Sequence, residues 1–535
     1  MKRTVAFVLF AVAGVLLFWN LGSPALWQDE AETALRAESI LETGVPRMSL
    51  RGTLVTAQPS LASYEGNAEG IWIWNTWVPA YLCAASFYLF GVLPWAARLP
   101  FALAGLLALM LAWRVFSQGE SDAIVDRRAW SAEIGVALLA LSPAFLLFCR
   151  QSRYYALVAL GTLMALWSWR RLLEKKPYGA LIVALSLNFL LHSSFAFFAI
   201  TAAALAVDAL LRFDECLRSR RYWGAAILTA LLALPAVLYF RIWERPGNHQ
   251  YGLRESLEFL KTLELWLLAF AVPLLVVVAA FVRRKVALAI GLVLLCGIVA
   301  EGRWSLICAV LAWCALIAAA VRMPAPYGVM NLRRMSLLLV AATLGLLSFG
   351  AAEPYGRYLA GVLAPLAYLV GREISWVARG RSWAVAALTL LCVTSNLAFI
   401  APLKAAQFIS VPEIPAESVS GMMRLRLREL GVKSDLARLL AELKRGPEGH
   451  VEPVTAAMQT RGGKNFFSDA DSLPLMFLTG FRPVYPEEFK TAEPDWILPS
   501  PWLKLSPDLY ARVQKLAVSG RYEAVGLEAD RKSVV

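Results

Sequence analysis

The chain has 535 residues, of which 59% are hydrophobic and only 17% are charged, and its mean hydropathy is +0.58. A soluble globular protein of this composition would expose large apolar patches, so the composition excludes that class and indicates a membrane protein. The net charge is +13, and residues 1–401 carry +12 of it, as 34 basic against 22 acidic residues. This excess lies in short loops between apolar segments, which is typical of cytoplasmic loops, so we expect no nucleic-acid partner.

Lys2 and Arg3 precede an apolar stretch from Thr4 to Leu21. The stretch fits a secretory signal or a first membrane helix, and we expect an uncleaved helix because no convincing cleavage site of small residues follows it. A helix needs about 20 residues to cross the ~30 Å hydrocarbon core, and apolar segments near that length recur up to residue 401. After the first, they lie near residues 77–93, 99–116, 131–148, 154–170, 178–191, 194–211, 223–240, 263–282, 286–300, 305–321, 335–351, 357–371 and 383–401.

Basic clusters set the expected orientation of these segments, because short loops rich in Lys and Arg stay in the cytoplasm. The clusters are Arg170-Arg171 with Lys175-Lys176, Arg218 to Arg221, Arg283 to Lys285, Arg333-Arg334 and Arg372 to Arg381. The alternating loops at His192, 241–262, 301–304 and 352–357, together with the tail, should then face outward.

The number of segments conflicts with this orientation. Fourteen crossings cannot join a cytoplasmic N-terminus to an outward tail, so we expect thirteen. Residues 71–93 are our candidate for the segment that fails to span, because Trp72, Trp74 and Trp77 suit an interfacial helix.

The sequence therefore predicts a polytopic, all-α membrane bundle of about 13 transmembrane helices over residues 1–401. Residues 22–76 should form an extracytoplasmic first loop, and residues 402–535 a small extracytoplasmic α/β domain. In that tail, Leu436 to Leu443 has helical periodicity, and the expected strands are Asn465 to Ser468, Asp495 to Leu498 and Tyr522 to Leu527. All seven Cys residues precede the tail, so no disulfide can stabilise it.

Asp29 and Glu30 lie in the first outward loop, a few residues after the first helix. Negative charge is favourable at the start of the helix expected from Ala31 to Leu41, so the pair fits an ordinary helix cap. A carboxylate held at the membrane surface can also act as a general base, with Glu30 orienting it or sharing a divalent metal ion. The residues alone leave both interpretations open.

The sequence Trp27-Gln28-Asp29-Glu30-Ala31 after a first helix resembles the GT-C superfamily of glycosyltransferases. The resemblance is to the family 39 group, which includes protein O-mannosyltransferases and the lipid A aminoarabinose transferase, and it covers residues 1 to about 400. Three further stretches carry it in the same order: Leu89-Phe90-Gly91 with Ala96 to Pro100 and Ala104-Gly105, then Gln151 to Leu157, then Arg357-Tyr358-Leu359 followed by Pro365.

The resemblance implies a GT-C enzyme of the bacterial inner membrane with a periplasmic C-terminal domain. In that family an acceptor hydroxyl attacks the anomeric carbon of a polyprenyl-phosphate-linked sugar with inversion, and the aspartate of the Asp-Glu pair acts as base. The matching residue is Asp29. The implied partners are the lipid-linked donor, membrane lipids, and a lipid, glycan or protein acceptor; neither the sugar nor the acceptor follows from the residues.

The departing lipid phosphate needs positive charge, which is scarce on the outward side of a membrane. Arg150, Arg153 and Arg357 are candidates because a guanidinium binds phosphate oxygens in pairs. Each has an ordinary alternative: Arg150 and Arg153 can snorkel to the interface, and Arg357 can pair with Glu353.

Four further residues complete the candidate substrate-binding set. His192, in a short outward turn, can donate to phosphate or can simply be a satisfied interfacial histidine. The side of the membrane that Arg98 faces depends on the unresolved crossing, and Tyr154 belongs to the stretch after Arg153. Glu69 can supply a second carboxylate, although a solvated loop residue is the simpler interpretation.

The chain departs from the family pattern at two points. Many relatives carry Pro-Pro where this chain has Asn67 to Trp74, and several carry an acidic residue where Ala156 to Ala165 has none. These departures leave the requirement for a divalent metal ion, and hence any cofactor, open.

Two other classes of function compete with the enzyme. A transporter or flippase of a lipid-linked saccharide should show internal repeats or ionisable residues at mid-membrane depth. The sequence shows no repeat, and only Asp208 and Glu264 come near helix interiors, each close to an expected boundary. The third class is an inactive scaffold that recruits partners through its outer domain.

Overall fold

The computed structural model describes residues 2–56, 62–120, 130–244, 252–270, 303–324, 326–350, 355–378, 381–394, 435–445, 449–500 and 506–525. The chain divides into two compact units. Unit 1 comprises Met1–Leu17, Ala102–Cys149 and Tyr154–Leu440, and unit 2 comprises Phe18–Phe101, Arg150–Arg153 and Ala441–Val535. Unit 2 therefore combines the region expected to be the first loop with most of the expected tail domain.

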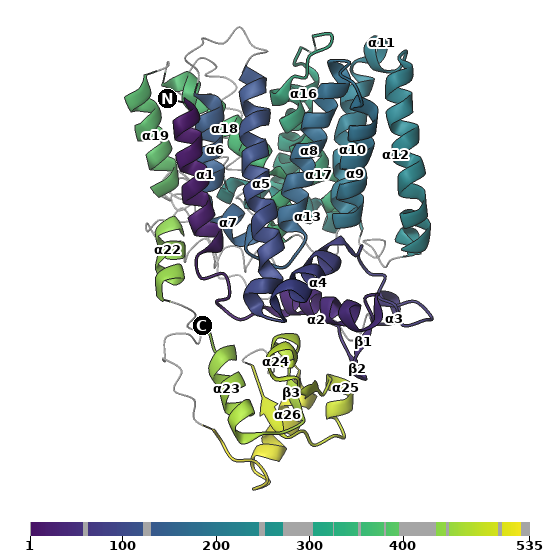
Figure 1. The fold of residues 1–535 in the computed structure, drawn as a ribbon, viewed down its shortest axis with the longest axis vertical. Helices are drawn as coiled ribbons and strands as arrows, with labels where there is room; N and C mark the ends of the chain where they lie inside the picture. Colours follow the sequence, from purple (N-terminus) through teal and green to yellow (C-terminus); the bar gives the residue numbers. More distant parts are fainter. Residues whose placement is uncertain are drawn as a thin grey trace. The chain divides into compact units, whose positions relative to one another are not determined.

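Unit 1 is a bundle of mainly apolar helices that run side by side (Figure 1). Helix α5 (Pro94–Glu120) begins in unit 2 and continues into unit 1. The other helices are α1 (Lys2–Phe18), α6 (Ser131–Ala140), α7 (Pro143–Cys149), α8 (Tyr155–Leu173), α9 (Gly179–Ser193), α10 (Phe195–Leu210), α11 (Phe213–Cys216), α12 (Arg220–Tyr239), the 3-10 helix η2 (Ile242–Glu244), α13 (Leu253–Phe270), α16 (Arg303–Val321), α17 (Leu332–Gly350), the 3-10 helix η4 (Gly356–Val362), α18 (Leu363–Val377) and α19 (Ser382–Thr394). Helix α22 (Asp435–Arg445) begins in unit 1 and ends in unit 2.

Most predicted segments correspond to a helix, with three informative differences. The segment at 131–148 is two helices, α6 and α7, bent by 60° where they meet, because Pro143 lacks a helical donor and disfavours helix at the residue before it. The segment at 357–371 begins as the 3-10 helix η4. Helix α13 starts at Leu253 rather than at residue 263, within a region expected to be an outward loop. The segment expected at 286–300 lies outside the described residues.

Length and composition identify the helices that can cross a membrane. Among the described residues these are α5, α8, α12, α16 and α17, with the bent pair α6 and α7 as a sixth if it forms one span. The expected thirteen crossings remain a prediction, because residues 271–302 and 395–434 lie outside the described stretches. Helix α4 (Val78–Phe90) has 13 residues, or about 20 Å at 1.5 Å per residue, which is less than the hydrocarbon core. Helices α9 and α10, with 15 and 16 residues, are also shorter than the core, so the interfacial position expected for residues 71–93 remains a prediction.

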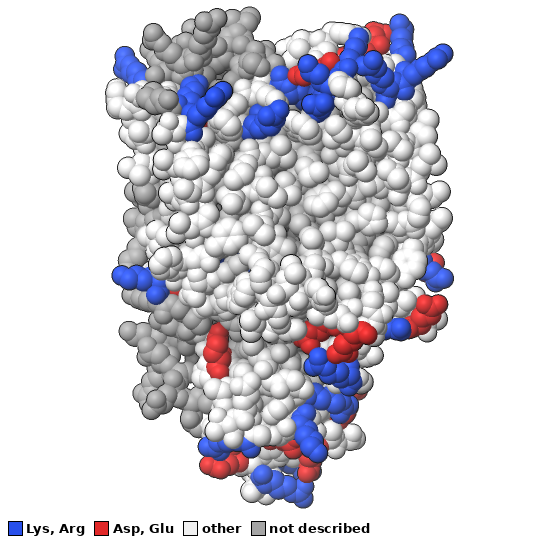
Figure 2. Space-filling model, in the orientation of Figure 1, with Lys and Arg blue, Asp and Glu red and all other residues white. Residues whose placement is uncertain are grey.

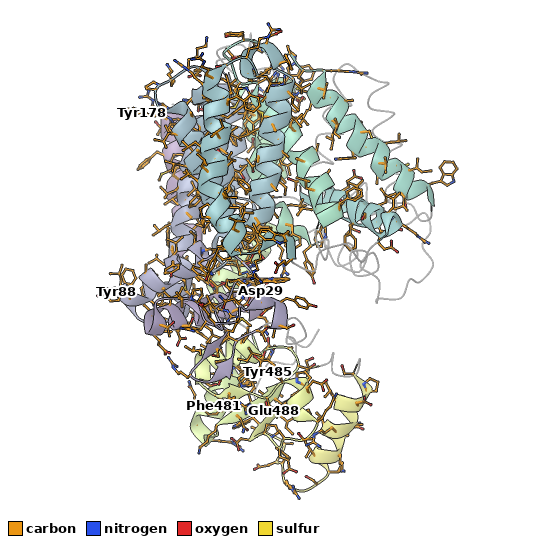
Figure 3. The ribbon with its side chains drawn as sticks, turned by 90° about the vertical axis from the view of Figure 1, so that its right-hand side faces the viewer. Asp29, Tyr88, Tyr178, Phe481, Tyr485 and Glu488 are labelled. Atoms are coloured by element: carbon orange, nitrogen blue, oxygen red, sulfur yellow. The ribbon has the colours of Figure 1, made fainter. Side chains whose placement is uncertain are left out.

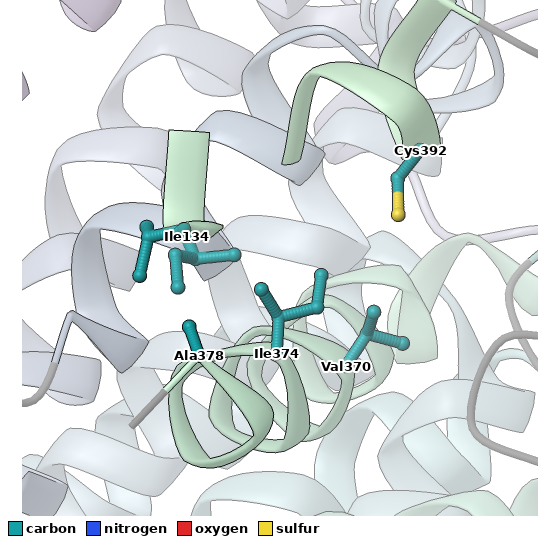
Figure 4. Packing of buried hydrophobic residues seen from close by; sticks show 6 residues of the cluster. Ile134, Val370, Ile374, Ala378 and Cys392 are labelled. Carbon is teal, nitrogen blue, oxygen red and sulfur yellow. The ribbon is translucent and has the colours of Figure 1, made fainter. Parts of the chain in front are cut away.

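Two glycines let α6 and α18 cross closely. A Cβ atom on Gly371 would lie 2.6 Å from the backbone nitrogen of Gly135, and one on Gly135 would lie 3.2 Å from the carbonyl oxygen of Ala367. Helices in lipid gain little from the hydrophobic effect, so close backbone approach supplies van der Waals packing instead. A buried apolar cluster continues from this crossing to α19 (Figure 4); it consists of Ile134, Val370, Ile374, Ala378, Val385 and Cys392.

Three basic loops of unit 1 lie together at one end of its helices. Arg221 donates to the carbonyl of Lys175 (3.0 Å), and Lys175 Nζ contacts Tyr327 Oη (3.3 Å). Figure 2 shows Lys and Arg gathered at this end, next to a broad band of the described surface that carries no charged side chains. The uncharged band agrees with a lipid-facing surface, and the cytoplasmic position of the basic end remains a prediction.

A buried ion network fixes the helix ends beside these loops. Asp208 of α10 pairs with Arg212 (Oδ2 to Nε, 3.0 Å) and with Arg334 of α17 (Oδ1 to Nη2, 2.7 Å), and all three side chains are at most 2% exposed. Trp169 Nε1 of α8 donates to Asp208 Oδ2 (2.9 Å), and Arg212 also pairs with Glu215 (3.2 Å). Asp208 therefore joins the ends of three helices, and its charge is matched.

We expect Asp208→Asn to destabilise unit 1 strongly. Arg334 would stay buried without its acidic partner, and breaking a buried ion pair in this way costs about 3–5 kcal/mol. The thermal unfolding midpoint of the purified protein in detergent, followed by intrinsic fluorescence, should fall clearly. Asp214→Asn is the control, because Asp214 and Arg218 pair at 3.2 Å with both side chains at least 73% exposed, so the midpoint should hardly change. Equal midpoints for the two variants would contradict the prediction.

Unit 2 is built around α2 (Gln28–Thr43), a helix with many charged residues that is nevertheless buried over most of its length. The helix ends at Gly44, whose φ of +82° is the left-handed conformation that glycine adopts readily. The chain continues as an antiparallel hairpin of β1 (Ser49–Leu50) and β2 (Thr53–Leu54), in which Ser49 pairs with Leu54, followed by α3 (Ala62–Glu65), α4 and the start of α5.

The tail part of unit 2 contains a three-stranded parallel sheet in the order β4–β3–β5. Parallel strands need crossover connections, and short helices supply them here. The elements are α23 (Val451–Arg461), β3 (Asn465–Ser468), α24 (Ser472–Thr479), β4 (Arg482–Pro483), α25 (Pro486–Phe489), β5 (Trp496–Leu498) and α26 (Pro507–Ala517).

The register and core of this sheet centre on β3. Phe466 pairs with Pro483 on one side and with Trp496 on the other, while Phe467 stacks on Phe489 with 3.7 Å between ring centroids. Two of the three expected strands are present. The third is absent from residues 522–525, and residues 526–527 lie outside the described part of the chain.

Candidate active site

The first turn of α2 carries Asp29 and Glu30. Trp27 precedes the helix in extended backbone, so both acids lie where the helix dipole is positive, as the capping interpretation expects. Their side chains nevertheless contact two different arginines from distant segments of the chain. The difference between these two contacts defines the site.

Glu30 is buried against Arg98 of α5. Its side chain is 1% exposed, and its two oxygens accept hydrogen bonds from Arg98 Nε (2.8 Å) and Nη2 (2.6 Å). The backbone N–H of Ser152 donates to the same carboxylate (2.8 Å). A two-point bond between a guanidinium and a carboxylate is strong and fixes geometry. Glu30 therefore holds the start of α2 against α5 and against the turn at 150–153.

Arg98 uses all of its donors within the protein. Besides its two bonds to Glu30, Nη1 donates to the carbonyls of Leu21 (3.1 Å) and Pro24 (2.6 Å), and Nη2 donates to that of Ala25 (3.1 Å). A guanidinium has five N–H donors, so these contacts leave none for a lipid phosphate. Arg98 is therefore the buried counter-ion of Glu30, and these contacts argue against the substrate-binding role expected from the sequence.

Asp29 has a looser and more exposed contact with Arg153. Its side chain is 18% exposed, and its Oδ2 lies 3.5 Å from Arg153 Nη2. Arg153 Nη1 donates to the backbone carbonyl of Asp29 (3.1 Å) and reaches Thr33 Oγ1 (3.4 Å). Figure 3 labels Asp29 on α2. Two neighbouring carboxylates thus differ: Glu30 is enclosed and bound at two points, whereas Asp29 borders solvent.

A row of buried charges continues from Asp29 along α2. Glu32 pairs with both Arg153 (3.5 Å) and Arg36 (3.6 Å), and Arg36 pairs in turn with Glu65 of α3 (3.9 Å). The charges along this row therefore alternate in sign from Asp29 to Glu65. Arg36 also donates to the carbonyls of Arg47 and Val55 and lies over the ring of Trp72, 5.1 Å from its centroid.

Glu32, Arg36 and Glu65 are not among the site residues expected from the sequence. A signal for the first two was present, because residues 29, 32 and 36 are spaced by three and four and therefore share one face of a helix. Nothing in the sequence brings Glu65 or Arg153 to that face, since they come from α3 and from a turn about 120 residues further along the chain.

Arg150 is a buried cation in the turn at 150–153. Its Nη2 donates to the carbonyl of Asn20 (3.1 Å). Burial is the main cause that lowers its pKa to about 10; the charge of Arg98 adds to this effect, and that of Glu30 opposes it. Arg150 remains charged at neutral pH, in surroundings that would favour an added anion.

Glu69 lies on an exposed turn of the same unit. Asn67 Oδ1 accepts hydrogen bonds from the backbone N–H groups of Glu69 (3.0 Å) and Ile71 (2.9 Å), and Arg47 Nη1 donates to the Glu69 carbonyl (2.9 Å). These contacts of Glu69 are made by its backbone. A site role for its side chain remains a prediction.

The other expected substrate-binding residues belong to unit 1 and share one end of it. Helix α8 runs from Tyr154 to the basic loops and α9 returns from them to His192, so both residues lie opposite the basic end. Arg357 of η4 follows α17, which also runs away from the basic end, and η4 packs on α10 where Gly361 meets Phe197. Arg357 lies over Tyr355, 4.3 Å from the ring centroid; Glu353, its alternative partner, lies outside the described residues.

The tail contacts the residue before Asp29. Gln28 Nε2 donates to Ser472 Oγ (3.1 Å), and Gln28 Oε1 accepts from the backbone N–H of Leu473 (3.2 Å) at the start of α24. Glu452 accepts from the backbone N–H of Ala25 (2.7 Å), and Tyr485 Oη donates to the carbonyl of Leu54 (2.8 Å). The tail therefore helps to hold the start of α2.

In the described stretches, no three His, Cys, Asp or Glu side chains are grouped so that they could hold a metal ion. Glu30, which the sequence offered as a partner of Asp29 in sharing a divalent metal ion, is bound to Arg98 instead.

Glu65 makes the stability of unit 2 depend on pH. Burial is the main cause that raises its pKa from 4.5 to about 7; Glu32 adds to this effect, Thr56 and Arg36 oppose it, and Tyr485 also faces the cluster. Between these two values the folded state keeps a proton that the unfolded state has lost. The free energy of unfolding should therefore fall as pH rises through this window, by roughly 3 kcal/mol in total, and then level off.

Glu65→Gln should remove this component. We expect the thermal midpoint of the parent protein to fall relative to that of the variant between about pH 5 and about pH 8, measured in detergent across a pH series. Glu69→Gln, which changes an exposed glutamate of the same loop, controls for a general effect of lost charge. A difference between parent and Glu65→Gln that stays constant over this range would contradict the prediction.

Comparisons with known proteins address the fold and the family. A model of the dolichyl-phosphate-mannose-protein mannosyltransferase family matches residues 75–240. A search of curated protein sequences gives no match. The solved structure of ArnT from Cupriavidus metallidurans in the apo state aligns with a TM-score of 0.51 and 16% identity over 95% of both chains.

Two further solved structures align less closely. ArnT from Cupriavidus metallidurans bound to undecaprenyl phosphate gives a TM-score of 0.48 at 15% identity over 94% of both chains. The archaeal oligosaccharyltransferase AglB from Archaeoglobus fulgidus gives 0.43 at 13% identity over 91% of this chain and 64% of that one. The shared fold with apo ArnT and the family match over residues 75–240 together confirm the resemblance of this chain to GT-C glycosyltransferases of the family 39 type.

Proposed function

We propose that the chain is an integral-membrane inverting glycosyltransferase that uses a polyprenyl-phosphate-linked sugar. Its acceptor is a hydroxyl group on the outward side of the bacterial inner membrane, where unit 2 carries Asp29. In the proposed reaction the acceptor oxygen bonds to the anomeric carbon and its proton passes to the Asp29 carboxylate. The bond between that carbon and the phosphate oxygen breaks, and polyprenyl phosphate leaves with the electron pair.

The observation that carries the proposal is the contrast between Asp29 and Glu30. A general base needs an oxygen that an incoming hydroxyl can reach. Glu30 is enclosed and bound by Arg98, so its proposed role is to position α2. Asp29 borders solvent, and its contact with Arg153 at 3.5 Å is longer than the 2.7–2.9 Å usual for a strong charge-assisted bond.

Positive charge for the leaving phosphate is proposed to come from Arg150 and Arg153, with Tyr154, His192 and Arg357 as further substrate-binding residues. The surroundings of Arg150 support its part, because a buried cation beside a second cation gains from an anionic ligand. Arg153 already pairs with the carboxylates of Asp29 and Glu32. In the proposed complex its guanidinium binds the donor phosphate in addition to these two carboxylates.

Asp29→Asn should lower turnover about 10²- to 10⁴-fold while donor binding persists, because the amide cannot accept the proton. Purified protein would be given a panel of labelled polyprenyl-phosphate sugars with lipid, glycan and peptide acceptors, and the labelled product measured. Glu42→Gln is the control, because Glu42 lies on the same helix and pairs with Arg51 at the surface. Turnover by Asp29→Asn at the parental rate would refute the proposed base.

Arg150→Gln should weaken binding of labelled polyprenyl phosphate by about ten- to a hundredfold, the effect of losing a hydrogen bond to a charged group. Binding can be measured by equilibrium titration in nanodiscs. Arg51→Gln, which removes an arginine whose side chain is 65% exposed on the same unit, is the matched control. Equal affinity of the two variants would remove Arg150 from the proposed site.

One observation favours the transporter class as a second candidate. Glu264 is buried in α13, and within the described part of the chain neither carboxylate oxygen has a hydrogen-bond partner. Buried ionisable side chains in a membrane protein often mark a transport pathway, although α13 is not among the described helices that are long and apolar enough to cross. Movement of a fluorescent lipid-linked sugar across vesicles, without any transfer product and lost in Glu264→Gln, would favour this candidate over the enzyme.

A further inference from the structure

Glu32 has no part in the proposed chemistry, yet it is a buried acid one helical turn from the proposed base. Its side chain is 8% exposed, and its two ion pairs connect Arg153 with Arg36. Burying a carboxylate is unfavourable unless its charge is matched. The position of Glu32 therefore calls for an explanation in terms of one of these arginines.

Arg36 has several partners besides Glu32, although Glu32 is the nearer of its two carboxylates (3.6 Å, against 3.9 Å for Glu65). Its guanidinium donates to the carbonyls of Arg47 and Val55, pairs with Glu65 and lies over Trp72. These contacts fix Arg36 from the side of the hairpin and α3. Arg36 can thus serve as a fixed anchor for Glu32, and the residue that Glu32 controls is Arg153.

The neighbouring pair shows what an arginine does when it has a single carboxylate to bind. Arg98 closes on Glu30 at two points, 2.8 and 2.6 Å, and encloses it. Arg153 meets two carboxylates instead: Nη2 lies 3.5 Å from Asp29 Oδ2, and Nη1 lies 3.5 Å from Glu32 Oε2. Nη1 also donates to the backbone carbonyl of Asp29 (3.1 Å) and reaches Thr33 Oγ1 (3.4 Å), so Glu32 supplies the charged member of the three acceptors around it. With Nη1 held among these acceptors, Arg153 does not close on the Asp29 carboxylate as Arg98 closes on Glu30.

We infer that Glu32 is a positioning residue that holds Arg153 between two carboxylates and so prevents it from enclosing Asp29. The inference rests on the proposed function only in taking Asp29 as the base. Glu32 touches no reacting atom; it acts through Arg153, and Arg36 fixes it in place. Removing its charge should let Arg153 close on Asp29 as Arg98 closes on Glu30.

The first readout is independent of activity. The full-length protein in detergent is treated with a carbodiimide, and modification of Asp29 is followed over time by peptide mass spectrometry. In Glu32→Gln we expect Asp29 to react several-fold more slowly than in the parent, because the second bond to Arg153 shields it. Adding Arg153→Gln to that variant should restore fast modification. Modification of Asp29 at the parental rate in Glu32→Gln would overturn the inference.

The second readout is turnover with the donor and acceptor identified for the parent protein. Glu32→Gln should lower kcat about ten- to a hundredfold with little change in the KM for the donor, since a small misplacement near the reacting groups has effects of that order. Glu32→Asp keeps the charge and should restore part of the rate. A rise in KM with unchanged kcat would overturn the positioning role.

Glu38→Gln separates this effect from a general loss of a buried acid. Glu38 lies on the same helix and is 8% exposed, but it pairs with Arg51 of the hairpin, at 3.0 Å, and not with Arg153. If Glu38→Gln slows modification of Asp29 as much as Glu32→Gln does, the inference fails. If Asp29→Asn keeps full turnover while Glu32→Gln still shields Asp29, the base assignment fails and the control of Arg153 by Glu32 stands.

Discussion

The structure of unit 2 depends on keeping the charges of one buried helix matched. Helix α2 places Glu30, Glu32, Arg36 and Glu38 at 8% exposure or less, and an unmatched charge in such surroundings would cost several kcal/mol. Each of these residues pairs with an opposite charge from another segment, apart from the pair that Glu32 and Arg36 form within the helix. The partners come from α3, the hairpin, α5 and the turn at 150–153, so the pairing brings together parts of the chain that are far apart in sequence.

This constraint gives two adjacent acids different properties. Both Asp29 and Glu30 lie at the positive end of the helix dipole, where carboxylates are favoured. Successive residues of a helix point about 100° apart, so Glu30 meets Arg98, whereas Asp29 shares a face with Glu32 and meets Arg153. The two acids have the same local sequence, so their arginine partners decide which carboxylate is enclosed. Arg98 binds Glu30 as its single carboxylate, whereas Arg153 is shared by Asp29 and Glu32.

Much of this could be predicted from the sequence, and the reasons differ by feature. Apolar length indicated most of the helices, since spanning a bilayer constrains composition directly, and the residues around Asp29 carried the family resemblance. The proline at position 143 is a sufficient signal for the bend between α6 and α7, although residues 131–148 were expected to form one segment. The role of Arg98 was not predictable, because its five acceptors depend on how the chain after α1 folds back on α5. Glu65 was equally hidden: its raised pKa follows from burial and from Glu32, and neither is visible in the residues around it.

The contacts between the tail and α2 could not be predicted from the tail sequence either, and they account for the tail belonging to unit 2. Taken alone, it looked like a separate outer domain, because its composition changes near residue 402. In the structure it supplies Ser472, Leu473 and Glu452 to the residues around Gln28, and Tyr485 to the hairpin beside Arg36. A polar helix cannot remain buried unless apolar and hydrogen-bonding surface covers it, and α24 packs along α2 where Phe477 also stacks with Phe87 of α4. The tail is thus part of what keeps α2, and with it Asp29, in a fixed setting.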